Sequence, residues 1–465
     1  MSWGTPDTIN RTAKILLDSG KVKDPDEARA FLESLILQIA VGADIDHDPA
    51  AQAALATVVN AGRRAYLGGV HVQLATDPTL ATGWTAGLTA SEMVTRYGGE
   101  IFEHLADDRP TLAIGRPREP VGKPVLYLTW RGWAGGVTQS AHDQLSGNGI
   151  VPAGIAAAAL GISETFQQKL GAVVPGRRDI GISLWRPDLD WRTDDAIGPA
   201  LQYLPAALWL LGLGHLGQAY AWTLGMLPYA TPSDVQLGLV DFDHIAEGNT
   251  ATQLLVDVQD RGHRKTRVVA AALQRLGLTT RIVERAYDQH FHPVAHGDPY
   301  RNEPTIALGG FDDVEPRRLL GEANFTRIID AGLGAGHVEY LDMVLHTFPS
   351  PEDPTTAFRE QPPSSRRLAL PYEAEIARQA EASANENAAR CGILDIAGIT
   401  VGAAFVGTFA STLVVADILR VLHDGADFSV IAVDLRNPSA IRAVPNSAPG
   451  LFIAPASALA AEPPQ

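Results

Sequence analysis

Apolar, β-branched runs alternate with helix-spaced apolar positions along the second half of the chain. The predicted strands lie in ALWLLGLG (207–214), DVQLGLVDFD (234–243), TRIVER (280–285), PTIALGG (304–310) and TRIIDAG (326–332), with helices from 216 and around 262–276. Strands that alternate with helices are typical of a doubly wound, mostly parallel α/β sheet of the Rossmann-like kind. The pattern therefore predicts this fold class for the second half.

The first half repeats parts of the same plan. PTLAIGRPREP (110–120) matches PTIALGGFDDVEP (304–316), LYLTWRGWAGGV (126–137) matches RIIDAGLGAGHV (327–338), and the Ala-rich stretch 149–170 matches 398–419. Three matches in one order predict a duplicated unit, a pseudo-dimer within one chain. The alternative is that any two α/β sheets produce strands this similar.

We expect the first half to be a degenerate copy. It has no glycine turn before its early strand, GGVHVQLATD (68–77), and its third strand ends in Arg116-Pro117, where the second half has Phe311-Asp312-Asp313. The predicted parts are a degenerate α/β half over 1–195, a nucleotide-binding domain over 196–447 with an inserted loop at 346–390, and a flexible tail over 448–465.

Composition narrows the function classes. The chain is 46% hydrophobic, which is ordinary for a globular protein. Its 465 residues are too many for one simple core. A net charge of −16 repels nucleic acid and anionic membranes. The single cysteine, Cys391, excludes an internal disulfide and a thiolate zinc site, so we expect no zinc and a cytoplasmic protein.

Two segments bear on targeting and membrane insertion. The first 20 residues lack a basic start followed by an apolar run, so we expect no signal peptide. The stretch 398–422 is long enough to span a bilayer, but it follows an α/β pattern and is predicted to be a buried core helix.

The candidate chemistry begins at the turn Gly212-x-Gly214-x-x-Gly217 between a strand and a helix. Such glycines let the backbone approach a phosphate, and the helix N-terminus offers free N–H groups. Asp241 ends the next strand, 24 residues past Gly217, where a carboxylate can accept ribose hydroxyls. These features suit NAD and ATP equally.

The residues after Asp241 point to a family. Asn249, Gln253 and Lys265 follow it by 8, 12 and 24 residues, and GGFDDVEPRRLL (309–320) comes later. Together they resemble the ThiF/MoeB/HesA family, the bacterial relatives of ubiquitin-activating enzymes, over residues 205–435. Asp312 and Arg317 stand in the places of that family's Thr-Asp-Asn-x-x-x-Arg element.

The chemistry of such a site is adenylation, in which a carboxylate attacks the α-phosphorus of ATP and pyrophosphate leaves. Asp312 suits a Mg²⁺ ligand because the hard cation prefers oxygen, and Lys265 can meet phosphate as a point charge. Asn249 and Gln253 are neutral donors that can orient the triphosphate. The resemblance implies that the carboxylate is the C-terminal glycine of a small ubiquitin-like or sulfur-carrier protein.

Each candidate also has an ordinary structural interpretation. Lys265 can belong to a solvated helix start, Asn249 to a turn, Asp241 to a strand end, Asp312 and Asp313 to a helix N-cap, and Arg317 to a surface ion pair. Cys391 lies seven residues before Gly398. Family members often carry a cysteine here that takes the carrier as a thioester or acyl disulfide, but a buried, inert thiol is equally open.

The sequence also departs from the family. Thr252 replaces a phosphate-binding arginine, and the opening Arg-Tyr-x-Arg-Gln helix is missing, although Arg11, Arg63 or Arg64 can substitute for its arginine. The Pro-rich stretch 347–388 lies where the family has a crossover loop that guides the carrier tail, and an inert loop is the alternative.

Three functions remain after these departures. The prediction is ATP- and Mg²⁺-dependent adenylation of a carrier, followed by transfer to Cys391. The alternatives are a nucleotide-binding scaffold without turnover and an NAD(P)-dependent oxidoreductase. Further pairing into a homodimer stays open.

Overall fold

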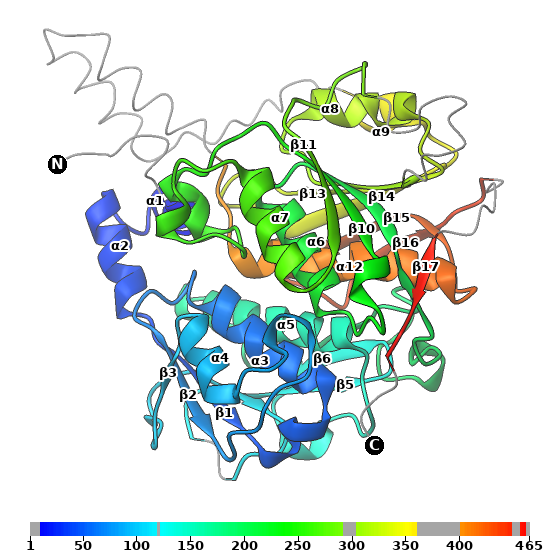
Figure 1. Cartoon of the computed structure of the whole chain (residues 1–465). Helices are drawn as coiled ribbons and strands as arrows, with labels where there is room; N and C mark the ends of the chain where they lie inside the picture. The colour runs from blue at the N-terminus through cyan, green and yellow to red at the C-terminus, as the bar shows by residue number, and fades with distance from the viewer. Residues whose placement is uncertain (1–9, 119–120, 292–303, 360–399, 449–455, 462–465) are drawn as a thin grey trace, which may run out of the picture.

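The chain forms two large sheets, one from each half, in a computed structural model that describes residues 10–118, 121–291, 304–359, 400–448 and 456–461. The first half occupies the lower part of Figure 1 and the second half the upper part. The sheet order is β3-β2-β1-β4-β5-β6-β7 in the first half and β11-β10-β9-β12-β13-β14-β15-β16 in the second.

The first half is built from residues up to 183. Its strands are β1 Leu37–Val41, β2 Val70–Leu74, β3 Glu100–Ile101, β4 Thr111–Ile114, β5 Val125–Arg131, β6 Ala134–Thr138 and β7 Ile180–Ser183. Its helices are α1 Arg11–Asp18, α2 Pro25–Ser34, α3 Pro49–Gly62, α4 Ala90–Arg96 and α5 Val151–Lys169.

The second half contains every strand and helix that the apolar pattern predicts there. Its strands are β9 Ala207–Leu211, β10 Gln236–Val240, β11 Thr279–Val283, β12 Ile306–Gly309, β13 Arg327–Leu333, β14 Asp342–Phe348, β15 Phe428–Asp434 and β16 Arg442–Pro445. Its helices are α6 His215–Met226, α7 Lys265–Arg275, α8 Val314–Arg318, α9 Pro354–Ala357 and α12 Ala404–Leu422.

The strand order confirms the duplication. In each half the first five strands of the sheet run parallel and the next pairs are antiparallel. The second half adds only the edge strand β16. The long helices α5 and α12 hold equivalent places and have 19 residues each. The fold is therefore the predicted α/β pseudo-dimer.

The prediction for the early strand of the first half is wrong in one respect. GGVHVQLATD contains β2, whereas the first strand of that sheet is β1 and the turn after it begins with Gly42. Asp44 fills this turn, because its Oδ1 accepts the N–H of Arg116 at 2.9 Å and lies 2.4 Å from where a Cβ on Gly42 would be. A carboxylate therefore sits where a phosphate cradle would have to open.

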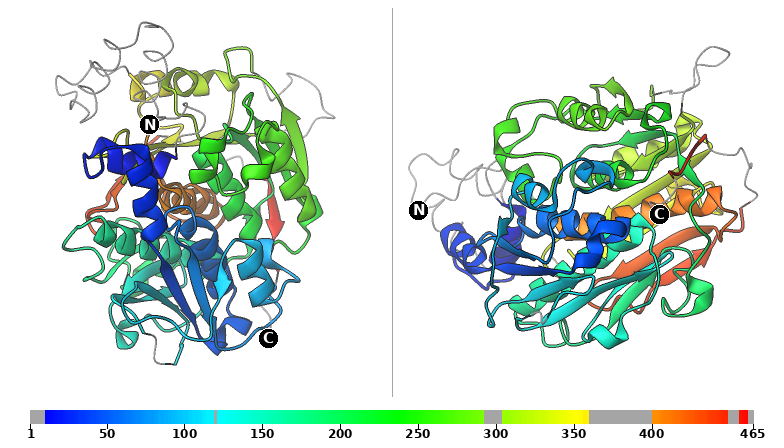
Figure 2. Two further views of the ribbon diagram at one scale, coloured as in Figure 1. Left: turned by 90° about the vertical axis from the view of Figure 1, so that its left-hand side faces the viewer. Right: turned by 60° about the horizontal axis from the view of Figure 1, so that its bottom comes forward.

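One apolar core joins the two halves. Helix α12 packs against both α5 and α6 and lies between the two sheets, as Figures 1 and 2 show in orange. Among the described helices only α12 is long and apolar enough to cross a membrane, and 89% of its apolar window is buried in the protein. The predicted buried helix is confirmed.

Aromatic contacts fix the junction. Trp84 of the first half stacks on Trp222 of the second with ring centroids 5.9 Å apart, and the Trp84 Nε1–H donates to the Trp222 carbonyl at 2.8 Å. Phe166 and Phe405 meet at 5.6 Å between α5 and α12.

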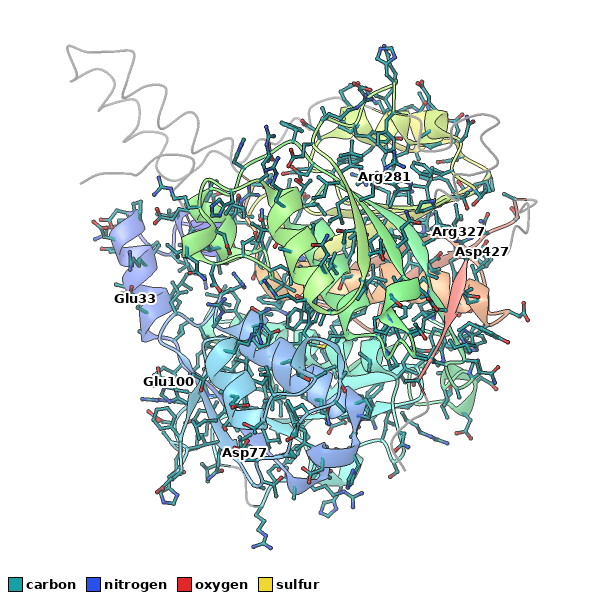
Figure 3. The ribbon with its side chains drawn as sticks, in the orientation of Figure 1. Glu33, Asp77, Glu100, Arg281, Arg327 and Asp427 are labelled. Atoms are coloured by element: carbon teal, nitrogen blue, oxygen red, sulfur yellow. The ribbon has the colours of Figure 1, made fainter. Side chains whose placement is uncertain are left out.

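Buried charges tie the end of α12 to the second sheet. Asp417 accepts from Arg327 at 2.6 Å and from Arg420 at 3.0 Å. Arg327 also pairs with Asp427 at 2.6 Å, and Figure 3 labels these two partners side by side. Paired in this way, the charges of α12 are compatible with burial.

Part of the segment expected to be a flexible tail is ordered. Ser457–Leu459 form β17, which pairs antiparallel with β8 (Tyr203–Pro205), and the Ala458 side chain is buried. The composition of the tail suggested no structure, but three backbone-paired residues need only an accessible strand edge.

Candidate functional site

A cavity of about 460 Å³ opens at the carboxyl ends of β9, β10 and β12. Eight of the residues singled out in the sequence line it: Gly212, Gly214, Asp241, Asn249, Gln253, Lys265, Asp312 and Arg317. In an open α/β sheet, ligands bind at this edge because the turns and helix N-termini meet there. Cys391 and residues 360–390 of the insertion lie outside the described residues.

The three glycines have three different roles. Gly212 adopts a φ of +83°, which L side chains rarely take, so it makes the turn. Gly214 has nothing within 4 Å of an added Cβ and lines the open cavity. Gly217 is not among the residues that line the cavity. A Cβ there would lie 1.8 Å from the Gly212 carbonyl oxygen, so the position requires glycine. It lets α6 approach the end of β9.

The turn leads into an uncapped helix. No side chain caps the N-terminus of α6, which begins at His215. The Asp241 carboxylate accepts the N–H of Leu213 at 2.7 Å and the N–H of Asp243 at 2.7 Å. These bonds hold Asp241 between the turn and the end of β10. His215 and Leu216 of the first turn of α6 line the cavity, and the N–H groups of a first turn have no partner within the helix.

Asn249 and Gln253 belong to one short segment, which we call the 249–257 segment. The Asn249 side chain accepts the N–H of Ala246 at 2.9 Å, and Gln218 of α6 donates to Gln253 Oε1 at 2.6 Å. Both side chains are nearly buried and face the cavity. Asn249 therefore does cap a turn, as its structural interpretation held, and it also lines the site.

Lys265 starts α7 and is 7% exposed, so it is not part of a solvated helix start. Its ammonium pairs with Asp243 Oδ2 at 2.7 Å. A cation held at the wall of the cavity by one carboxylate can still meet a phosphate with its remaining protons.

Arg317 forms a buried ion pair, not the surface pair considered from sequence. Its Nη2 and Nε contact Asp330 Oδ2 at 2.5 and 2.8 Å, and its guanidinium lies 4.2 Å from the centroid of the Phe358 ring. Burial raises the pKa of the Asp330 carboxyl to about 6. The other oxygen of Asp330 has no hydrogen-bond partner among the described residues, and Gly309 leaves the space for it.

Asp312 is exposed and reaches the cavity from the turn after β12. Asp313, next to it, is the N-cap residue of α8, but its side chain makes no capping bond. The described residues contain no group of three or more His, Asp or Glu that would hold a metal by themselves. A metal here would need oxygen ligands from the bound substrate.

The structure separates the three arginines proposed as substitutes. Arg11, at the start of α1, lines the cavity and donates to Thr400 Oγ1 at 3.0 Å. Arg63 and Arg64 do not reach it. The first half therefore contributes one cation, Arg11, to the site.

Arg64 instead holds the 249–257 segment from behind. Its Nη2 donates to the carbonyls of Leu254 and Val256, both at 3.2 Å, and its Nη1 donates to the Thr250 carbonyl. Asn60 donates to the Leu254 carbonyl at 3.0 Å. Burial lowers the pKa of Arg64 to about 9, so it remains charged at pH 7. We call these two residues the α3 clamp.

Sequence reasoning missed His215 and the acidic partners. The His215 ring lies against the start of α12, with Nε2 3.5 Å from the Ala404 carbonyl oxygen, and burial lowers its pKa to about 4. Asp243 was visible two residues after Asp241 in VDFD. No local pattern singles out Asp330, because an acidic residue within a strand resembles any other polar residue there until its arginine partner is known.

Comparison with known proteins gives the family. Residues 36–184 match the model of the BilD N-terminal domain, and residues 204–425 match the model of the BilD C-terminal domain. A protein named bacterial E1-like protein BilD, from Collimonas sp. (strain OK412), is 37% identical over 430 residues, which is 91% of each chain. The chain belongs to the BilD family. The E1-like name of this BilD relative agrees with the resemblance to the ThiF/MoeB/HesA family, which is confirmed.

Solved structures are more distant from this BilD family member. E. coli MccB is 13% identical with a TM-score of 0.34 over 71% of this chain and 95% of its own. The E. coli tRNA N6-threonylcarbamoyladenosine dehydratase TcdA, in complex with ATP, is 19% identical with a TM-score of 0.20 over 25% of this chain and 44% of its own. Neither is similar enough to inform the chemistry of this chain.

Proposed function

We propose that this protein uses ATP to adenylate the C-terminal carboxylate of a small ubiquitin-like or sulfur-carrier protein that ends in glycine. One observation carries the proposal. A single cavity gathers the glycine turn, the free N-terminus of α6, Asp241 and the neutral donors Asn249 and Gln253. The E1-like relative supports the reaction class.

The residues of the cavity would have separate roles in adenylation. The turn and the N-terminus of α6 would bind phosphate oxygens, and Asp241 would accept ribose hydroxyls. Lys265 and Arg11, which both line the cavity, would neutralise charge that develops on the phosphates. The carrier carboxylate would then attack the α-phosphorus, and pyrophosphate would leave.

Mg²⁺ fits the site as a substrate-bound cation. Mg²⁺ is usually held by one or two carboxylates together with substrate phosphates and water. Asp312, exposed at the cavity and without an ion pair among the described residues, has the oxygen donors for this role. The ion would screen phosphate charge. Asp312 would hold it beside the phosphates.

A second candidate is a nucleotide-binding scaffold without turnover. The cations Lys265 and Arg317 are already paired with Asp243 and Asp330, and Thr252 stands in place of a phosphate-binding arginine. An NAD(P)-dependent oxidoreductase, the third sequence-based alternative, has only the glycine turn and Asp241 in its favour, and the E1-like family counts against it.

ATP–pyrophosphate exchange tests the proposal. Purified protein with Mg²⁺ and a Gly-Gly-ended carrier should exchange pyrophosphate only when the carrier is present. Asp312→Ala should abolish exchange, and the control Asp195→Ala, an exposed acid outside the cavity, should retain it. ATP binding without exchange for any carrier would favour the scaffold, and binding of NAD in place of ATP would favour the oxidoreductase.

Transfer to Cys391 is the second half of the proposal. In this step the thiolate attacks the acyl carbon of the adenylate and AMP leaves, which forms a thioester. A Cys391→Ala variant should then keep ATP–pyrophosphate exchange and lose the thioester on a non-reducing gel. Carrier-dependent exchange by the wild type with no thioester on the gel would instead favour the inert thiol for Cys391.

A further inference from the structure

A second and larger cavity lies between the two halves, on the other side of the segment that forms the nucleotide site. Its volume is about 1390 Å³, and its walls come from α4 and the turn around Trp84 in the first half and from α7 and residues 254–264 in the second. We call it the arginine cleft. His244 lines both cavities. Figure 1 shows α4 and α7 on the same side of the molecule.

The lining of the arginine cleft carries a positive charge, although the chain as a whole is negative. Five arginines line the cleft: Arg63, Arg96, Arg264, Arg267 and Arg275. Only two acidic residues, Asp257 and Asp260, face them in the lining, although the whole chain carries a net charge of −16. A cluster of one sign inside a chain of the other sign selects its ligand by charge.

Some of these cations have no internal partner. Arg63 pairs with Asp257 at 2.6 Å, and Arg267 pairs with Glu284 at 2.8 Å. Across the part of the chain that the structure describes, Arg96 and Arg275 form no ion pair and no side-chain hydrogen bond. Both lower the pKa of the Tyr97 phenol, against the larger effect of burial, so both guanidinium groups lie near one tyrosine.

Helix ends explain only part of this arrangement. Arg96 lies in the last turn of α4 and Arg275 in the last turn of α7, where a cation is favoured by the helix dipole. Arg63 is the C-cap residue of α3, where the same preference applies. Arg264 is the N-cap residue of α7 and Arg267 lies in its first turn, where the helix dipole disfavours a cation. Their convergence on one cleft needs a further cause.

The volume of the arginine cleft and the apolar residues in its lining indicate the class of ligand. Small-molecule pockets commonly measure about 300–1,000 Å³, which is less than this cleft. Between the arginines the lining is apolar and aromatic, from Trp84, Tyr97, Leu254, Leu255, Leu276 and Leu278. We propose that the arginine cleft is a docking site for an acidic peptide segment of a partner protein, whose carboxylates pair with Arg96 and Arg275 and whose apolar side chains rest on this floor.

The proposal goes beyond the proposed adenylation and does not depend on it. The test uses the full chain and a fluorescein-labelled synthetic peptide with the repeat Glu-Asp-Leu, read by fluorescence polarisation. The matched peptide has lysine in place of each acid. The acidic peptide should bind, more weakly at higher salt, and the lysine peptide should not.

Charge reversal locates the binding. The double variant Arg96→Glu/Arg275→Glu should weaken binding of the acidic peptide at least tenfold. Its control is Arg177→Glu/Arg442→Glu, which makes the same change in net charge at two exposed arginines outside the cleft. This control should bind the peptide within about twofold of the wild type, and both double variants should keep the wild-type affinity for ATP.

Four outcomes would overturn the proposal. The wild type fails to bind the acidic peptide, or both double variants lose it equally. Inorganic tripolyphosphate binds in a cleft-dependent way while the peptide does not, which would assign the cleft to a small anion. Sedimentation shows a dimer that the Arg96→Glu/Arg275→Glu variant alone disrupts while the peptide does not bind, which would assign the cleft to a second copy of this chain.

Discussion

Single residues in the glycine turn carry separable functions. Gly217 is needed for the approach of α6 to β9, whereas Gly214 is needed only for open space at the cavity. A substitution at each position should therefore affect different properties of the protein.

Gly217→Ala should lower the free energy of unfolding, whereas Gly214→Ala should not. The Gly217 methyl would lie 1.8 Å from the Gly212 carbonyl oxygen, so the backbone must shift, at a cost of about 1–3 kcal/mol. The Gly214 methyl meets no atom within 4 Å and would stand in the phosphate path. Urea titration and ATP binding measure both effects. Equal stability losses at the two positions would contradict this assignment.

His346 makes the second half sensitive to acid. Burial lowers its pKa to about 4, from the usual 6.5, and its ring lies among Phe348 and Phe358. Because the unfolded chain binds this proton more readily, the stabilising contribution is complete above pH 6.5. It is lost progressively as the pH falls from about 6.5 to about 4.

His346→Phe should therefore flatten the loss of stability between pH 6.5 and pH 4. The measurement is the unfolding midpoint in urea at a series of pH values. His142→Phe, a change at an exposed histidine of the first half, is the control and should keep the wild-type slope. A His346→Phe curve parallel to that of the wild type would show that another group causes the acid sensitivity.

At the scale of elements, the α3 clamp makes the degenerate half part of the nucleotide site. Arg64 and Asn60 contribute four hydrogen bonds to backbone carbonyls of the 249–257 segment. That segment carries Asn249 and Gln253 into the cavity. The first half has no open phosphate-binding turn of its own, but it supports one wall of the nucleotide site in the second half.

Arg64→Met should raise the dissociation constant for ATP about tenfold or more. The substitution removes the donor of the Thr250 and Val256 carbonyls, while the Leu254 carbonyl keeps the bond from Asn60. Each unsatisfied group costs about 1–3 kcal/mol, so the segment must rearrange. The control is Tyr66→Phe, which removes a buried hydrogen bond to Thr165 and leaves the segment untouched. Hydrogen exchange at 249–257 should rise only in Arg64→Met, and unchanged ATP binding in that variant would exclude the role.

The elements of the second half were predictable because each strand is a short apolar run between turns. The spacing of Asn249, Gln253 and Lys265 from Asp241 likewise placed these residues at one cavity. What escaped prediction depends on pairing across the chain. Neither β1 as the first strand nor the bond between Arg64 and the Thr250 carbonyl follows from local pattern, because both need the partner strand or the other half.

The whole molecule behaves as one unit in its packing. Trp222 on α6 stacks on Trp84 of the first half, meets Tyr97 edge-on at 5.3 Å and donates its Nε1–H to Thr57 Oγ1 at 3.1 Å. One apolar core runs through both halves. Two halves that share a core should unfold together.

Trp222→Ala should accordingly destabilise the half that does not contain it. Loss of a fully buried tryptophan costs about 3–5 kcal/mol, and here the cavity opens on the junction. Hydrogen exchange should rise in β1 of the first half as well as in β9 of the second. Trp209→Ala, an equal loss in a separate apolar cluster within the second half, should also raise exchange in both strands if the two halves unfold together. If protection in β1 survives Trp222→Ala while β9 loses it, the halves are independently stable domains that merely touch.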